Sequence, residues 1–188
     1  MNKTILYHGS NKFITNTIKP FTSFHNTPYV YATSDYLYAL VRAGNFNPEI
    51  LSFKEDYNGT SYTLVELTET AFKDTFDTEG YIYLLDNKNF SKVQNMLPKQ
   101  EDNSTLLPNE YISTQKCEIQ KVIYIPNVGE EILKHISENP DYYNIIYYNT
   151  SEEKDYWKSV RGGKEGYLKR RMERARKLNK MKEDDVNV

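Results

Sequence analysis

Short runs of strand-forming residues, separated by polar loops, constrain the fold of this chain more than any other feature. The runs are rich in β-branched and aromatic residues and are bounded by glycine, proline or other turn residues, which is typical of strands joined by turns. They do not alternate with helices in a βαβ rhythm, so a parallel, doubly wound sheet is not expected. The pattern predicts an α+β fold with a largely antiparallel β core, whose strands lie at Thr4–His8, Tyr29–Ala32, Ser61–Leu67, Gly80–Leu85, Glu118–Ile125 and Tyr143–Tyr148.

Three segments have the spacing of amphipathic helices. Ser34–Ala43 begins at a Ser/Asp cap and stops at a glycine, and Val128–Glu138 ends before a proline. Glu165–Lys182 is strongly basic, with a thin apolar stripe formed by Leu168, Met172, Ala175 and Leu178. Ser91–Pro108 is interpreted as a long loop and a candidate active-site lid, and Ser151–Gly163 as a linker.

Length and composition exclude several classes of protein. A chain of 188 residues fits one domain with an appendage, and its 14% aromatic content is enough for a core. One cysteine, Cys117, and three separated histidines argue against a disulfide framework or a metal site. The chain contains no apolar run long enough to span a membrane, and its first residues lack an apolar signal core. We therefore expect a cytoplasmic protein without a bound metal.

Charge divides the chain into an acidic body and a basic tail. Residues 1–153 hold 12 Lys and Arg against 20 Asp and Glu, a net charge of −8, whereas residues 154–188 hold 12 against 6, a net charge of +6. The predicted organisation is a domain over residues 1–150, followed by a linker and a basic helix over 151–188. The basic residues from Arg161 to Lys182 are either a solvated helix face lying on the acidic body or a contact surface for nucleic-acid phosphates.

His8-Gly9-Ser10 follows the first predicted strand. Because Gly9 has no Cβ, a planar ligand could approach its backbone, whose N–H and C=O could pair with a carboxamide. Ser10 and His8 could add further hydrogen bonds. The alternative is a strand followed by a turn with a capping serine.

Two tyrosines lie where a strand passes into a helix. Tyr31 stands in the strand and Tyr38 in the helix that follows, and tyrosine faces are platforms for aromatic ligands. The alternative is core packing, since the chain contains 17 tyrosines.

Glu110 enters a strand after the long polar loop. A single carboxylate there could bind a ribose hydroxyl and stabilise a positively charged sugar ring during cleavage of a glycosidic bond. The alternative is an ordinary surface acid.

Taken in order, the three segments His8-Gly9-Ser10, Val30-Tyr31-Ala32 and Asn109-Glu110-Tyr111-Ile112 resemble the ADP-ribosyltransferase superfamily. The similarity is to its His-Tyr-Glu branch, which contains the diphtheria-toxin-like and poly(ADP-ribose) polymerase enzymes, and it covers about residues 4–148. In the polymerases the signature tyrosine stands two residues before the alanine, a position that Val30 occupies here. Either a bulge compensates for this shift, or Tyr31 does not line the site.

The resemblance implies a split, mainly antiparallel core and NAD as the substrate. It assigns Gly9 to the carboxamide, Tyr38 to stacking beneath nicotinamide, and His8 and Glu110 to the two riboses. The reaction would break the nicotinamide–ribose bond and pass ADP-ribose to an unknown protein or nucleic-acid acceptor, or to water.

Two other functions stay open at this stage. One is a catalytically inactive module of the same fold that docks a partner or nucleic acid through its basic tail. The other is an RNA 2′-phosphotransferase-like enzyme, which would need arginines to bind a phosphate. Arg42 is the only arginine before Arg161, which ranks the phosphotransferase third.

Overall fold

The fold is α+β, with a mainly antiparallel β core, as the sequence predicts. The computed structural model describes residues 5–22, 27–55, 61–93, 109–170 and 172–173. The expected lid over Ser91–Pro108 falls mostly outside these ranges, as do Ala175 and Leu178 of the expected apolar stripe. Within the described residues, no helix is both long and apolar enough to cross a membrane.

The larger sheet is antiparallel throughout its described pairings. Within the described residues it holds eight strands, in the order β2-β10-β7-β1-β4-β9-β8, with β3 paired to β4. Their bounds are β1 Ile5–Ser10, β2 Thr17–Ile18, β3 Phe21–Thr22, β4 Pro28–Thr33, β7 Gly80–Asp86, β8 Ser91–Lys92, β9 Glu110–Ser113 and β10 Cys117–Ile125.

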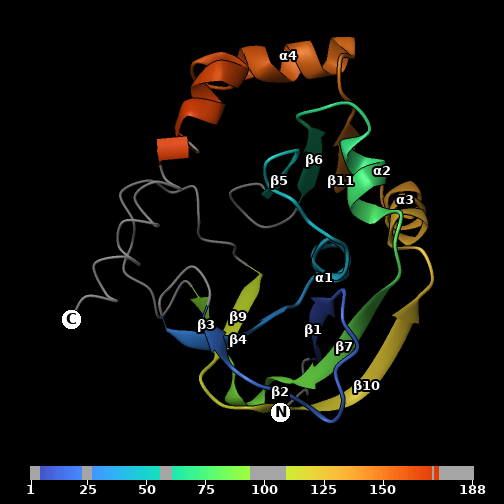
Figure 1. The fold of residues 1–188 in the computed structure, drawn as a ribbon, viewed down its shortest axis with the longest axis vertical. Coiled ribbons are helices and arrows are strands. Elements are labelled where there is room, and N and C mark those ends of the chain that lie inside the picture. The colour runs from blue at the N-terminus through green and yellow to red at the C-terminus, as the bar shows by residue number, and fades with distance from the viewer. Residues whose placement is uncertain (1–4, 23–26, 56–60, 94–108, 171, 174–188) are drawn as a thin grey trace.

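A smaller sheet lies across the molecule from the larger one (Figure 1). It contains β5 (Leu51–Glu55), β6 (Tyr62–Glu66) and β11 (Tyr143–Ile146). The β5–β6 pairing is antiparallel, whereas β11 runs parallel to β6. Parallel neighbours need a long connection, and in the described part of the chain this connection contains the strands β7 to β10 and two α-helices.

Helix α1 (Tyr36–Ala43) lies between the two sheets (Figure 1). Asp35 caps its first turn by accepting a hydrogen bond from the backbone N–H of Tyr38. Leu40 is fully buried, in one cluster with Ile82 of the larger sheet and Leu64 of the smaller. Cover from both sheets explains why α1 is apolar around most of its circumference, whereas Arg42 is exposed.

Two further helices cover the same cluster: α2 (Ala71–Phe76) and α3 (Val128–Glu138). Phe76 and Ile132, both fully buried, anchor them there. The prediction of α3 is confirmed with the same bounds, whereas α2 and β5 were not predicted. Between β7 and β8 the chain makes one 3-10 turn, η1 (Asn87–Asn89).

The expected linker over Ser151–Gly163 is wrong, because its first nine residues form helix α4 (Ser151–Ser159). Trp157 is buried with Val65 and Ile146 of the smaller sheet. The segment is polar enough to suggest a linker, but Trp157 and the carboxylate of Glu153 are both buried against the body.

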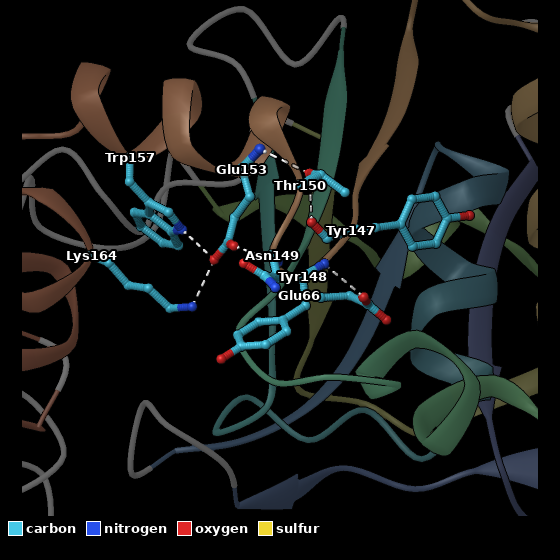
Figure 2. A network of polar contacts seen from close by, with 8 residues as sticks. All are labelled: Glu66, Tyr147, Tyr148, Asn149, Thr150, Glu153, Trp157 and Lys164. Atoms are coloured by element: carbon cyan, nitrogen blue, oxygen red, sulfur yellow. Dashed lines mark hydrogen bonds and ion pairs between the residues drawn. The ribbon is translucent and has the colours of Figure 1, made fainter.

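A polar network holds α4 in place (Figure 2). The carboxylate of Glu153 accepts hydrogen bonds from the backbone N–H of Asn149 at 2.7 Å, from Trp157 Nε1 at 2.9 Å and from Lys164 Nζ at 2.7 Å. A second buried carboxylate, Glu66, accepts from the backbone N–H of Tyr148 at 2.9 Å. Buried charges need such partners, so the network ties the C-terminal segment to β6 and β11.

The basic tail continues as a helix over residues 163–170 and 172–173. Tyr167 packs on Trp157, and its hydroxyl lies 2.7 Å from Ser52 Oγ on β5. Leu168 packs against the same cluster, while Met172 is exposed. The described part of the tail is therefore docked on the smaller sheet.

Candidate functional site

The sheet order brings the three signature segments side by side. His8 lies on β1, Tyr31 on β4 and Glu110 at the first position of β9, and β1, β4 and β9 are consecutive in the larger sheet. His8 and Glu110 are about a hundred residues apart in sequence, so this arrangement is a property of the fold alone.

Strands β1 and β4 are joined differently from their neighbours. Six residue pairs connect β1 to β7, whereas the described pairing with β4 consists of Tyr7 opposite Thr33. Beyond this pair, His8 Nδ1 lies 2.7 Å from the carbonyl oxygen of Tyr31. The imidazole thus reaches the β4 backbone at the point where the two strands stop pairing.

This contact fixes the state of the His8 ring. A carbonyl oxygen only accepts, so Nδ1 carries the hydrogen and Nε2 of the neutral ring is an acceptor. Burial lowers the pKa of His8, and its hydrogen bond to the Tyr31 backbone only partly opposes this. His8 is therefore neutral at pH 7 and offers Nε2 to a hydroxyl donor.

Tyr31 meets His8 through its backbone, and its ring lies elsewhere. The four β4–β9 pairs run without a register shift from Val30 to Thr33, so the alternative of a compensating bulge is wrong. By strand alternation, Tyr31 is on the same face as Glu110. His8 follows Tyr7, which pairs with Thr33, so the His8 side chain is on the opposite face, with Tyr83, Val30 and Leu6. The Tyr31 ring packs against an aromatic and aliphatic cluster made of Phe21, Tyr29, Val93 and Ile112.

Gly9 is explained by helix packing. A Cβ at this position would lie 1.8 Å from the carbonyl oxygen of Ala39 and 2.8 Å from the backbone nitrogen of Ala43, so α1 could not cross β1 there. Ser10 Oγ accepts a hydrogen bond from the backbone N–H of Lys12 at 3.1 Å, which is the turn-capping role considered as the alternative. A ligand role for these two residues is not needed to account for their identity.

Glu110 is half-buried beside a tyrosine and an arginine. Tyr38 Oη donates to Glu110 Oε1 at 3.3 Å, and Arg42 Nη2 donates to Tyr38 Oη at 2.9 Å. Burial raises the pKa of Glu110, while the charge of Arg42 and the hydrogen bond from Tyr38 act in the opposite direction. The site therefore holds a carboxylate whose charge depends on two neighbours from α1.

The Tyr38 ring does not present an open face. The Arg42 guanidinium lies 5.1 Å from its centroid, and the ring of Phe53 lies 5.4 Å away. Tyr38 itself is buried, so its hydroxyl is the part that reaches Glu110. Its observed contacts are those of the core-packing alternative, with a polar tip at the site.

Asn109 fixes the start of β9. Its carbonyl oxygen accepts from the backbone N–H of Ser34 at 3.1 Å, and its side-chain amide donates to Tyr62 Oη at 2.8 Å. Because Ser34 precedes α1 and Tyr62 belongs to the smaller sheet, Asn109 orients Glu110 relative to both.

Arg42 is the site residue that the sequence analysis did not assign. Two signals point to it: it is the only arginine before Arg161, and it stands four residues after Tyr38 on a helix, where side chains are neighbours. A hollow of about 350 Å³ elsewhere, lined by residues of the Asp86–Asn89 turn and by Gln115–Glu118, contains none of these side chains.

Comparison of this chain with protein-family models, with curated proteins and with solved structures gave no match. The function is therefore inferred from the residues of the site and from the resemblance of their motifs.

Proposed function

We propose that this protein is an NAD-dependent ADP-ribosyltransferase, which breaks the nicotinamide–ribose bond and transfers ADP-ribose to an acceptor. The observation that carries the proposal is the placement of His8, Tyr31 and Glu110 on three consecutive strands. The half-buried position of Glu110, next to Tyr38, supports it further. A carboxylate in such a setting acts more strongly on a nearby positive charge than one in open water.

In the proposed reaction the bond between ribose C1′ and the nicotinamide ring nitrogen breaks. The electron pair goes to nicotinamide, which leaves as a neutral molecule, and positive charge develops on the ribose ring. Ionised Glu110 stabilises that charge and accepts a hydrogen bond from a hydroxyl of this ribose. The acceptor then bonds to C1′ and loses a proton to solvent.

The other site residues bind the substrate in this proposal. Neutral His8 accepts a hydrogen bond at Nε2 from a hydroxyl of the adenosine-side ribose. By resemblance, the backbone of Gly9 and the hydroxyl of Ser10 belong to the carboxamide end of the pocket. Tyr31 supports His8 through its carbonyl oxygen.

An RNA 2′-phosphotransferase is a further candidate, because Arg42 lies in the site. A guanidinium is the usual partner of a phosphate. However, the charge of Glu110, coupled to Arg42, repels a phosphate at the same place. We therefore prefer an enzyme that transfers ADP-ribose from NAD to an acceptor and removes no phosphate from RNA.

The test is release of nicotinamide from NAD by the purified full chain, comparing wild type with Glu110→Gln. Glutamine keeps the shape but not the charge, so we expect turnover to fall by about 10²–10³-fold, equivalent to roughly 3–4 kcal/mol of transition-state stabilisation. Glu118→Gln, an exposed acid on β10, is the matched control and should leave turnover unchanged.

The outcomes separate the candidate functions. Equal turnover in wild type and Glu110→Gln removes Glu110 from the reaction. NAD binding without nicotinamide release identifies an inactive binding module. Removal of a 2′-phosphate from RNA, in a parallel reaction with NAD, identifies the phosphotransferase.

A further inference from the structure

We infer that Arg42 is a positioning residue of the candidate site, which holds the Tyr38 hydroxyl as a hydrogen-bond donor to Glu110. The three groups form a chain from one side chain to the next. Arg42 Nη2 lies 2.9 Å from Tyr38 Oη, and Tyr38 Oη lies 3.3 Å from Glu110 Oε1. The inference rests on the proposed function for its catalytic meaning, because Glu110 is the group that it serves.

The direction of the chain follows from the donors. A guanidinium only donates, so Tyr38 Oη accepts from Arg42. A tyrosine hydroxyl has a single hydrogen, which is then left to point at the carboxylate of Glu110. Loss of Arg42 removes the donor that sets this direction.

The geometry of α1 keeps Arg42 in this position. Residues four apart on a helix are neighbours, which places the guanidinium over the Tyr38 ring at 5.1 Å from its centroid. The Phe46 ring, beyond the end of α1, lies 5.6 Å from the same guanidinium. Two aromatic rings thus restrict an arginine whose outer surface is exposed.

Among the titratable neighbours of Glu110 in the described part of the chain, Arg42 carries the positive charge. The titratable neighbours are Tyr38 and Arg42 on α1, Tyr31 on the paired strand β4, and Tyr62 of β6, which reaches Asn109. Burial alone favours a protonated, neutral Glu110. Arg42 opposes this directly and through Tyr38, and so favours the ionised form that the proposed reaction requires.

The experiment measures the pKa of Glu110 by NMR titration of the side-chain carboxyl carbons, with the resonance identified by its loss in Glu110→Gln. We expect Arg42→Gln to raise the pKa of Glu110 and Arg42→Lys to return it toward the wild-type value. Arg161→Gln, the same substitution at an exposed arginine outside the site, should leave it unchanged. Circular dichroism establishes that each variant is folded.

A double-mutant cycle separates positioning from a simple charge effect. Tyr38→Phe removes the bridging hydroxyl, so Arg42→Gln should shift the pKa of Glu110 less in that background than in wild type. An unchanged pKa in Arg42→Gln, or equal shifts in both backgrounds, would overturn the inference.

None of these titrations needs NAD, so the two proposals fail separately. If wild type releases nicotinamide, the acidic limb of its pH–rate profile should move to higher pH in Arg42→Gln. If no NAD is cleaved, the proposed function fails, while the Glu110 titration still decides whether Arg42 positions this carboxylate.

Discussion

His8 carries a pH dependence of stability that one substitution can isolate. Burial lowers its pKa in the folded chain below the value of about 6.5 expected in the unfolded chain. Between these two pKa values the unfolded chain binds more protons than the folded chain. The contribution of neutral His8 to the free energy of unfolding is therefore fully present above pH 6.5 and is lost as the pH falls through the folded pKa.

We predict that His8→Asn removes this loss. The asparagine amide can donate to the Tyr31 carbonyl from near the position of Nδ1, but it does not titrate. Denaturant unfolding at pH 7 and pH 5 should show a smaller drop in the free energy of unfolding for His8→Asn than for wild type. Equal drops would mean that His8 is protonated without cost in the fold.

A second residue-scale prediction concerns Gly9. Gly9→Ala should lower the free energy of unfolding by about 1–3 kcal/mol, because the new methyl group collides with the α1 backbone at Ala39. Ser10→Ala is the control and should cost at most about 1 kcal/mol, since it removes one exposed hydrogen bond. Chemical denaturation measures both, and a near-neutral Gly9→Ala would show that α1 can move away from β1.

At this scale the sequence predicts which residues matter better than how they act. His8, Tyr38 and Glu110 are all visible as candidates, but Tyr38 and Glu110 are 72 residues apart and meet only because β4 and β9 pair. Gly9 resembles a ligand-binding glycine, and its actual contact, a helix crossing, depends on tertiary structure. Arg42 becomes meaningful only once its partner Tyr38 is placed beside Glu110.

At the scale of the elements, helix α4 contains a buried carboxylate, Glu153, whose contribution to stability can be measured. Burial opposes ionisation of Glu153, but hydrogen bonds from Lys164, Trp157 and the backbone of Asn149 lower its pKa overall. We predict that Glu153→Gln lowers the free energy of unfolding by about 1.5–3 kcal/mol at pH 7, because the amide cannot satisfy all three donors. Thermal or denaturant unfolding measures this loss.

Glu152→Gln is the matched control, one residue away and exposed, with one hydrogen bond from Asn144. It should change stability by less than about 1 kcal/mol. The difference in the free energy of unfolding between wild type and Glu153→Gln should also shrink at low pH. It should decrease as the pH falls below the ordinary glutamate pKa of 4.5 and through the lowered pKa of Glu153. A difference that is independent of pH would argue against an ionised Glu153.

Local sequence predicts an element well where the signals that start and end it are local. The sequence predicts Val128–Glu138 with its observed bounds because its apolar spacing and the following proline lie close together in the chain. Helix α4 was missed because its stability depends on Trp157 and Glu153 meeting β6 and β11, which no periodicity reveals. Helix α2 is only six residues long, too short for a clear pattern.

For the whole molecule, two truncations separate the structural role of the tail from a nucleic-acid role. A chain ending at residue 163 loses Lys164, Tyr167 and Leu168, which contact Glu153, Ser52 and the Trp157 cluster. We predict a lower melting temperature for it than for wild type. A chain ending at residue 173 keeps these contacts and should melt at the wild-type temperature.

Binding to DNA and RNA at several salt concentrations completes this comparison. If the basic residues after 173 bind phosphates, the chain ending at residue 173 should bind nucleic acid more weakly than wild type. The affinity of wild type for duplex DNA should also fall with salt: its logarithm should drop by roughly 0.9 per neutralised phosphate for each tenfold rise in salt concentration. Salt-independent or absent binding leaves the tail with a structural role. An unchanged melting temperature in the chain ending at 163 would contradict the docking.

The position of α1 between two sheets has a consequence for how the chain folds as it is synthesised. Helix α1 is complete at Ala43, yet its cover from the smaller sheet is finished only when β11 ends at Ile146. At about 5–20 residues per second, the roughly 100 intervening residues take on the order of 5–20 s to emerge from a ribosome. During that time the apolar residues of α1 lack their complete cover, so we expect the nascent chain to expose apolar surface of the kind that chaperones bind.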